Sequence, residues 1–292
     1  RASERRGAVA SYAGECHPNS TPRVFVLSNG VYSLLMTSTG LSRASAGAVS
    51  IYRGFDNAIH GPAGFAVRLE RQGGGCDLLP LPGGEGKLDF TYRLQGGLLR
   101  FEGRGADFDC AVTSGVSARD TSEVRIVELT ARREIAGELV IEFEPTLANA
   151  GDYAAHPAYW RLGMCAGLEG SALLIRRLPR QGAPGCWLCV ASDAPVEVRA
   201  NATGEELGWL SHPHVTARAA VKLAAGESCT CRFAVAFGAE RKLALEAAQR
   251  ALRCGAGQIA DLTSALGAVY GLDAKELAGL PEMAGRLLFA RA

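Results

Sequence analysis

The sequence predicts a mainly β domain followed by a helical segment, and three observations lead to this prediction. Residues 23–237 contain short alternating or β-branched apolar runs separated by Gly, Pro, Asp and Asn, which is typical of an antiparallel sandwich or barrel. From Ala239 onward the apolar period changes from two to about 3.6. The first residues are polar and aperiodic. We therefore expect a disordered leader over 1–21, a β domain over 22–238 and a helical linker over 239–292.

The clearest local signal is a hairpin near the start of the β domain. Residues 24–27 are apolar, Ser28-Asn29-Gly30 follows, and the apolar run resumes over 31–36. An Asn-Gly pair supplies the positive φ angles that a tight two-residue turn requires. The sequence therefore predicts two antiparallel strands joined at Asn29 and Gly30.

Later strands are predicted from strict alternation of side-chain type. Over 138–144, Leu139, Ile141 and Phe143 alternate with mostly acidic residues, so the carboxylates are expected on one face of a sheet and the apolar side chains on the other. Residues 215–223 and 231–237 show the same alternation and are separated by a short Gly-containing segment. This spacing predicts that the last two runs form a hairpin.

The helical linker is predicted in separate pieces. Residues 240–253 are rich in Ala, Leu, Glu, Lys and Arg and lack Gly and Pro, which favours a helix that ends at Gly255. A second apolar stripe over 259–269 ends at Gly271, and residues 287–289 are strongly apolar. Such a tail is expected to pack against a further domain.

Composition excludes several classes of function. The 31 Lys and Arg residues nearly balance 30 Asp and Glu, so no excess of positive charge exists to bind a nucleic acid. No apolar run reaches the roughly 18 residues of a transmembrane helix, and the first residues lack the apolar centre of a signal peptide. We expect a soluble, cytoplasmic protein. Because the sequence does not begin with Met, we expect a fragment.

The cysteines and histidines predict neither a disulfide framework nor a metal site. Nine cysteines scattered through a long chain are typical of buried free thiols in a reducing compartment. Cys186 and Cys189 have the spacing of half a zinc knuckle, but the other close pair, Cys229 and Cys231, does not. No third ligand can be argued for His212 and His214. The expected metal content is none.

Several segments, in order along the chain, resemble the N-terminal region of glycoside hydrolase family 94. Leu27-Ser-Asn-Gly-Val-Tyr-Ser33 is similar to the family's opening strand pair. Asp152-Tyr-Ala-Ala-His-Pro-Ala-Tyr159 resembles its Asp-x-x-x-His-Pro-Ala-Phe segment, and residues 172–180 resemble the stretch that follows. The family includes cellobiose, chitobiose, laminaribiose and 1,2-β-oligoglucan phosphorylases and parts of cyclic β-1,2-glucan synthases.

The resemblance implies a galactose-mutarotase-like β-supersandwich, then linker helices, then an (α/α)6 barrel that carries the chemistry. In the family an Asp of the barrel protonates the leaving oxygen while inorganic phosphate attacks the anomeric carbon with inversion. No residue here corresponds to that Asp, so the catalytic barrel is expected to be absent and this chain alone inactive. The implied partners are the barrel, a β-linked glucose oligosaccharide and a second copy in a homodimer, without a cofactor.

The substrate-binding candidates lie where the sequence keeps or departs from the family pattern. Ser42 and Arg43 retain a Ser-Arg pair whose flanking aromatic residues are lost, and Arg53 follows Tyr52 where an Arg-aromatic pair is usual. A guanidinium group suits phosphate or sugar hydroxyls. His156 is the fourth candidate, with a structural hydrogen-bonding role as its alternative. The text around Tyr159 suggests the 1,2-β-oligoglucan branch.

Two other functions are kept as alternatives. One is a free-standing carbohydrate-binding β-sandwich module, against which the apolar tail argues. The other is a mutarotase-like epimerase, which needs a His base and a Glu acid facing one sugar. His156 and Glu144 are the pair that the sequence offers for that chemistry.

Overall fold

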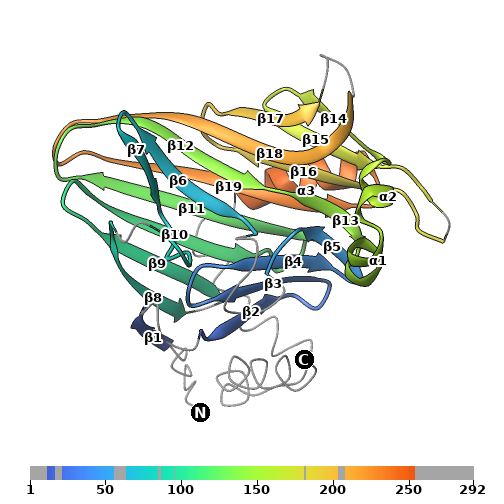
Figure 1. Cartoon of the computed structure of the whole chain (residues 1–292), viewed down its shortest axis with the longest axis horizontal. Coiled ribbons are helices and arrows are strands. Elements are labelled where there is room, and N and C mark those ends of the chain that lie inside the picture. Colours follow the sequence, from blue (N-terminus) through green and yellow to red (C-terminus); the bar gives the residue numbers. More distant parts are fainter. Residues whose placement is uncertain are drawn as a thin grey trace, which may run out of the picture.

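The chain forms two layers of antiparallel sheet, with one long helix on the outer face of the larger sheet (Figure 1). A computed structural model gives the structure of residues 12–16, 22–55, 64–84, 87–95, 97–180, 182–202 and 208–253, without the side chains of 201, 202 and 208–212. The predicted leader residues 1–11 and 17–21 and the predicted helical segments after residue 253 lie outside this description.

The larger sheet has 14 strands and the smaller has five. In spatial order the large sheet contains β1 (Tyr12–Glu15), β8 (Asp89–Gln95), β9 (Leu98–Arg104), β10 (Phe108–Val116), β11 (Ser122–Ala131), β19 (Ser228–Gly238), β16 (Cys186–Ser192), β15 (Ala172–Arg177), β14 (Met164–Glu169), β18 (Gly208–Leu223), β12 (Ile135–Phe143), β6 (Ala66–Arg71) and β7 (Gly74–Asp77), with β17 (Glu197–Ala202) beside β18. The small sheet contains β13 (Pro145–Asn149), β5 (Val49–Tyr52), β4 (Ser42–Ala46), β3 (Tyr32–Thr37) and β2 (Val24–Ser28). The helices are α1 (Ala150–Ala155), α2 (Pro157–Arg161) and α3 (Arg241–Arg253).

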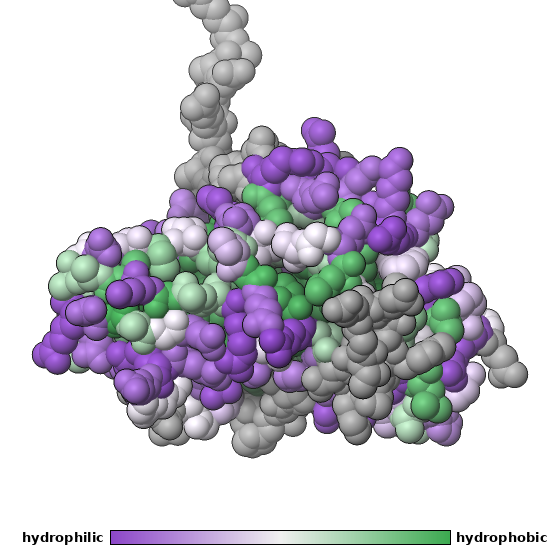
Figure 2. All heavy atoms as spheres, turned by 90° about the horizontal axis from the view of Figure 1, so that it is seen from above, coloured by the Kyte–Doolittle hydropathy of each residue, from purple (hydrophilic) through white to green (hydrophobic). Residues whose placement is uncertain are grey.

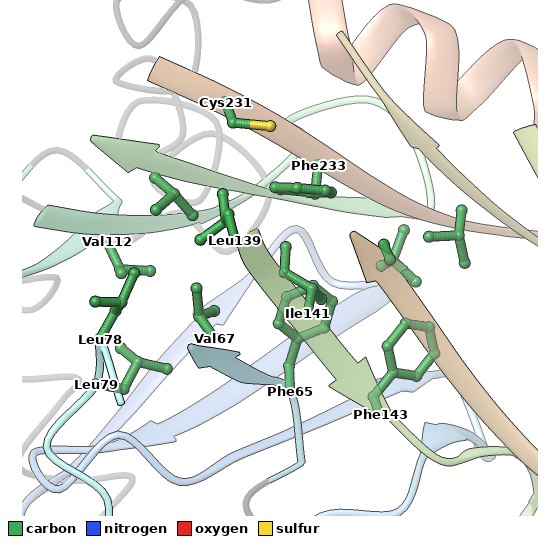
Figure 3. Packing of buried hydrophobic residues seen from close by; sticks show 14 of the residues in the cluster. Phe65, Val67, Leu78, Leu79, Val112, Leu139, Ile141, Phe143, Cys231 and Phe233 are labelled. Carbon is green, nitrogen blue, oxygen red and sulfur yellow. The ribbon is translucent and has the colours of Figure 1, made fainter. Parts of the chain in front are cut away.

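Both sheets enclose the hydrophobic core, and the large sheet contributes to it from β12 as well as from β19. Leu139, Ile141 and Phe143 of β12 are at most 2% exposed and point into the core, with Phe143 stacked on Phe65 at 5.4 Å between ring centroids (Figure 3). Figure 2 shows the molecule from above, where hydrophilic residues lie on either side of a band of hydrophobic ones. The mainly β fold predicted from periodicity is confirmed.

The opposite face of β12 carries the predicted carboxylates. Glu138 lies directly opposite Glu70 of β6, an arrangement of like charges that is unfavourable on its own. Arg218 of β18 donates to both, at 2.8 Å to Glu70 and 2.9 Å to Glu138. The guanidinium of Arg218 therefore offsets the repulsion between Glu70 and Glu138 and lets β6 pair with β12 in this register.

Helix α3 confirms the helix predicted over 240–253 and packs through alanines. Ala244, Ala247, Ala248 and Ala251 are buried against small residues of β16 and β19. Small side chains on both sides let the helix backbone approach the sheet closely. Arg250 fixes the later part of the helix through Asp120, with nitrogen–oxygen distances of 3.2 and 2.9 Å.

Two strand predictions need correction. Tyr12–Glu15 was expected within a disordered leader, but it forms β1 and pairs with β8, because the Tyr12 ring packs against Phe25 and Tyr92. The strands β18 and β19 are consecutive but do not form a hairpin. Each already has partners on both sides, namely β14, β17 and β12 for β18, and β11 and β16 for β19.

The predicted hairpin of β2 and β3 is present, but Asn29 contributes differently from the expectation. Gly30 alone takes the positive φ, at 87°. The Asn29 side chain accepts hydrogen bonds from the backbone N–H groups of Val31 and Tyr32, and its amide donates to the carbonyls of Ser117 and Asp120. Asn29 therefore joins the turn of the small sheet to the β10–β11 turn of the large sheet.

A fully buried ion pair links the sheets through their interior. Glu123 and Arg125 of β11 are both 0% exposed and lie 3.2 Å apart. From the small sheet, Tyr32 donates to Glu123 at 3.2 Å and Tyr52 donates to it at 3.1 Å. Burial raises the pKa of both phenols, so they stay protonated as donors. We call these four side chains the buried ionic network.

The guanidinium of Arg125 completes the network from several directions. It donates to Ser114 of β10 at 2.6 Å and to the Tyr52 hydroxyl at 3.1 Å. It also lies over the ring of Phe65, at 4.9 Å from the centroid. Residues of β3, β5, β10 and β11 are thus held by one pair of buried charges.

We predict that Glu123→Gln destabilises the protein by about 3–5 kcal/mol, because the charge of Arg125 would remain buried without compensation. Replacing both partners, as Glu123→Leu with Arg125→Met, is expected to cost less than Glu123→Gln alone. Urea denaturation measures both changes. The control is Arg199→Ala, whose ion pair with Glu197 is exposed and should contribute less than about 1 kcal/mol. Equal effects of Glu123→Gln and Arg199→Ala would contradict the prediction.

Candidate functional site

The candidate site is a cluster around Glu144, which lies between the end of β12 and the start of β13. Its carboxylate accepts hydrogen bonds from Tyr153 at 3.0 Å and from Arg53 at 3.3 Å, and it forms a close ion pair with Arg161. Arg161 also donates to the Tyr153 hydroxyl at 3.1 Å. We call these four residues the Glu144 cluster.

The local backbone explains how these side chains meet. The β13–β5 pairing shifts register between Pro145 and Ala148, and Leu147 there has a φ of 47°, which is strained for a residue with a branched side chain. Asn149 then caps α1 by accepting from the N–H of Gly151 at 2.9 Å. After this bend, α1 and α2 lie beside β13 (Figure 1). Tyr153 of α1 and Arg161 of α2 reach Glu144 from there.

The electrostatics of the cluster keep Glu144 ionised. Burial opposes the charge, but hydrogen bonds from Tyr153 and Arg161, the charge of Arg161 and a hydrogen bond from Arg53 outweigh it, so the pKa of the carboxyl is lowered. A carboxylate held in this way cannot donate a proton at neutral pH. The cluster is therefore suited to holding guanidinium groups in place and unsuited to general acid catalysis.

Arg53 is the member of the cluster that can reach a ligand. Its side chain is 50% exposed, and among the described residues its guanidinium hydrogen-bonds only to Glu144, through one terminal nitrogen. Its backbone is also fixed, because its N–H donates to the carbonyl of Glu144 at 2.7 Å. A fixed guanidinium with free donors can bind phosphate or sugar oxygens.

The structure brings three of the four predicted site residues together. Gly54 packs so closely on β4 that a Cβ there would lie 2.7 Å from the Cβ of Arg43, which places residues 42–43 against residues 53–54. Arg43 is half-buried. Ser42 is fully buried and accepts a hydrogen bond from the N–H of Phe65 at 2.9 Å, so its hydroxyl supports the loop there. Ligand contact by Ser42, Arg43 and Arg53 stays a prediction.

His156 lies at the junction of α1 and α2. Its backbone N–H donates to Asp152 at 3.0 Å and its carbonyl accepts from Trp160 at 3.3 Å. The imidazole is exposed, and within the described ranges it makes no hydrogen bond or ion pair. Its ligand-binding role stays a prediction, and the exposure leaves the ring available for one.

Sequence reasoning missed Tyr153 and Arg161. Both lie in or next to the 152–159 segment that carries the family resemblance, but they are eight positions apart. Only the two-helix turn brings them onto one carboxylate. The same turn stacks Arg180 over the Tyr159 ring, at 4.3 Å from its centroid, and Arg177 over Trp160, at 5.3 Å.

The described part of the chain contains no group of three or more His, Cys, Asp or Glu placed to hold a metal ion. Its eight cysteines are free. None of its helices has the length and apolar character that a membrane span needs.

Comparison with known proteins identifies the fold. Residues 11–199 match a family described as "Glycosyl hydrolase 94, supersandwich domain". A comparison with curated proteins finds no match. The match covers more than half of the chain and includes β1, which the sequence analysis had placed in the leader.

Solved structures show the same architecture at low sequence identity. A protein from the human microbiome assigned as a kojibiose phosphorylase overlays with a TM-score of 0.56 and 10% identity, over 86% of this chain and 36% of its own. A bacterial glucoamylase in complex with acarbose gives a TM-score of 0.51 and 6% identity, over 94% and 44%. Identities this low show the fold alone. This chain therefore spans less than half the length of either protein.

We predict that Glu144→Gln lowers stability by about 1–2 kcal/mol at pH 7, because the charge that pairs with Arg53 and Arg161 is lost. The folded-state pKa of Glu144 is lowered, so its contribution is present above the ordinary value of 4.5 and fades as the pH falls below it. Denaturant unfolding at pH 7 and at pH 3–4 measures the change. A stability difference between wild type and variant that is the same at both pH values would contradict the assignment.

Proposed function

This chain belongs to the glycosyl hydrolase 94 supersandwich family, and we propose that it forms the N-terminal part of an inverting phosphorylase that cleaves β-glucosidic bonds. The family match over residues 11–199 is the observation that carries the proposal. The overlays, which cover less than half of a phosphorylase and of a glucoamylase, agree with one domain of a larger enzyme. We further propose 1,2-β-oligoglucans as substrates. We also propose a cytoplasmic location, which the free cysteines of the described residues support because thiols persist in a reducing compartment.

The chemistry then belongs to a catalytic (α/α)6 barrel, with inorganic phosphate as co-substrate and no cofactor. The Glu144 cluster supports this division because its carboxylate is held ionised and cannot act as the acid. The same observation does not favour the epimerase alternative, which requires Glu144 as a proton donor facing His156. The role left to this chain is to bind saccharide, to shape the mouth of the barrel and to pack against the barrel.

The surface of α2 supports a packing role against the barrel. Tyr159 of α2 is 43% exposed and Leu162, the C-cap of α2, is 67% exposed, so two large apolar side chains three positions apart face the surface. Arg180 lies over the Tyr159 ring. Aromatic residues and arginines are enriched at protein interfaces, where they contribute much of the binding free energy. We propose that this face of α2 contacts the barrel and that Arg43, Arg53 and His156, positioned in part by Ser42, border its sugar site. A homodimer of the complete enzyme is part of the same proposal.

The direct test measures phosphate consumption and release with β-linked glucose disaccharides and 1,2-β-oligoglucans. The assay uses this chain alone and a longer protein in which it is joined to the coding sequence that follows. Turnover is expected only in the longer protein, because the acid is supplied by the barrel. Turnover by the 292 residues alone would refute the proposal. Sugar binding without turnover in both forms would favour the free-standing module.

In the longer protein, Arg53→Ala is expected to raise KM for phosphate or saccharide by about tenfold with the fold intact, since one charge-assisted hydrogen bond contributes about 1.5–3 kcal/mol. Arg199→Ala is the matched control, because that arginine is exposed on β17 and pairs only with Glu197 among the described residues. Identical kinetics of the two variants would remove Arg53 from the site.

A further inference from the structure

The last residue of β15 places a guanidinium at the margin of the hydrophobic core. Leu173 and Ile175 belong to the core, and Arg177 is the next residue on the same face of the strand. Its side chain is 2% exposed, and its guanidinium carbon lies 5.3 Å from the centroid of the Trp160 ring. A positive charge is therefore buried next to α2, at the end of the molecule where α1 and α2 lie (Figure 1).

Arg177 has one neutral hydrogen-bond acceptor and no carboxylate among the described residues. Its Nη2 donates to the carbonyl of Pro184 at 2.5 Å, whereas its Nε and Nη1 are buried without a hydrogen-bond partner. Cys186 lies directly opposite on β16, but burial raises the pKa of this thiol more than the guanidinium lowers it, so the sulfur is neutral. A buried charge without an opposite charge is strongly unfavourable.

Arg180 places a second guanidinium beside the same helix. It is half-buried and lies over the Tyr159 ring, at 4.3 Å from the centroid. It also packs on Gly163, where a Cβ would lie 2.9 Å from its Nε. Within the described ranges it makes no ion pair. We call Tyr159, Leu162, Arg177 and Arg180 the α2 patch, which combines two exposed apolar side chains with two positive charges.

The acidic residues nearest in sequence do not neutralise this patch. Between residues 144 and 185 they are Glu144, Asp152 and Glu169. Glu144 is held within the Glu144 cluster, and Glu169 pairs with Arg241 of α3 at 2.6 Å. Asp152 is exposed and forms no ion pair with any described residue. The positive charge of the α2 patch is therefore left for a partner to compensate.

We propose that the α2 patch docks an acidic segment of the catalytic barrel, with one carboxylate on Arg180 and another that replaces the Pro184 carbonyl as acceptor for Arg177 when the turn over 180–184 shifts. A protein segment suits the patch better than a small anion, which would leave Tyr159 and Leu162 uncovered. Complementary charge also fixes how two surfaces align. The barrel as the partner rests on the proposed function, whereas the acidic character of the occupant rests on the patch alone.

Arg177→Met tests the uncompensated charge in this chain alone. Met keeps an apolar contact with Trp160 and removes the charge, so the midpoint of thermal unfolding is expected to rise by at least about 2 °C. Arg125→Met is the matched control and should lower the midpoint, because it breaks the ion pair with Glu123. Circular dichroism measures both. A midpoint of Arg177→Met at or below that of the wild type would overturn the inference.

Hydrogen exchange tests the docking in the longer protein that includes the following coding sequence. Amides of residues 158–163 are expected to exchange at least about tenfold more slowly there than in this chain alone. Arg180→Glu should remove most of this protection, and about 0.5 M NaCl should reduce it by screening the ion pairs. Arg199→Glu makes the same change of charge on exposed β17 and should leave the protection unchanged.

Protection of α2 that survives both Arg180→Glu and high salt would overturn the acidic partner and leave the packing role of α2 intact. Absence of protection in the longer protein would overturn both. Protection of α2 in this chain alone by millimolar inorganic phosphate would assign the patch to a small anion and so overturn the inference. Phosphorolysis is assayed separately, so its absence would refute the proposed activity without changing the exchange result.

Discussion

The burial of Glu123 and Arg125 is the constraint on which the arrangement of the two sheets depends. A carboxylate and a guanidinium with no exposure to water must be satisfied by hydrogen bonds within the protein. Glu123 obtains two of these from Tyr32 and Tyr52, which belong to the small sheet. Since apolar contacts alone tolerate sliding of one layer over the other, these directional bonds fix where the small sheet lies on the large one.

The position of the small sheet in turn fixes the candidate site. Tyr52 ends β5, and Arg53 follows it directly, so the network that holds Tyr52 also places Arg53 beside Glu144. The bend at Leu147 then brings α1 and α2 over the same edge. As a result, the Glu144 carboxylate stays ionised and holds the guanidinium groups of Arg53 and Arg161. This arrangement suits positioning and binding better than acid catalysis.

Much of the fold followed from periodicity, and the site followed less completely. Alternation located β12 and α3, and the resemblance of residues 152–159 pointed to the segment that forms α1 and α2. Tyr153 and Arg161 could not be paired with Glu144 in advance, because that contact depends on a strained residue and a two-helix turn with no periodic signal.

The sequence by itself determined the class of the fold, the long helix α3 and the family, because side-chain periodicity and ordered motifs are local properties of the chain. The tertiary structure decided which strands pair. Strands β18 and β19 are consecutive in sequence, yet three strands lie between them in the sheet, because each forms its backbone hydrogen bonds with other partners. It also decided that Asn29 serves as a bridge between turns and that Glu144 stays ionised. Such roles depend on groups up to about a hundred residues away in sequence, and a local pattern carries no record of them.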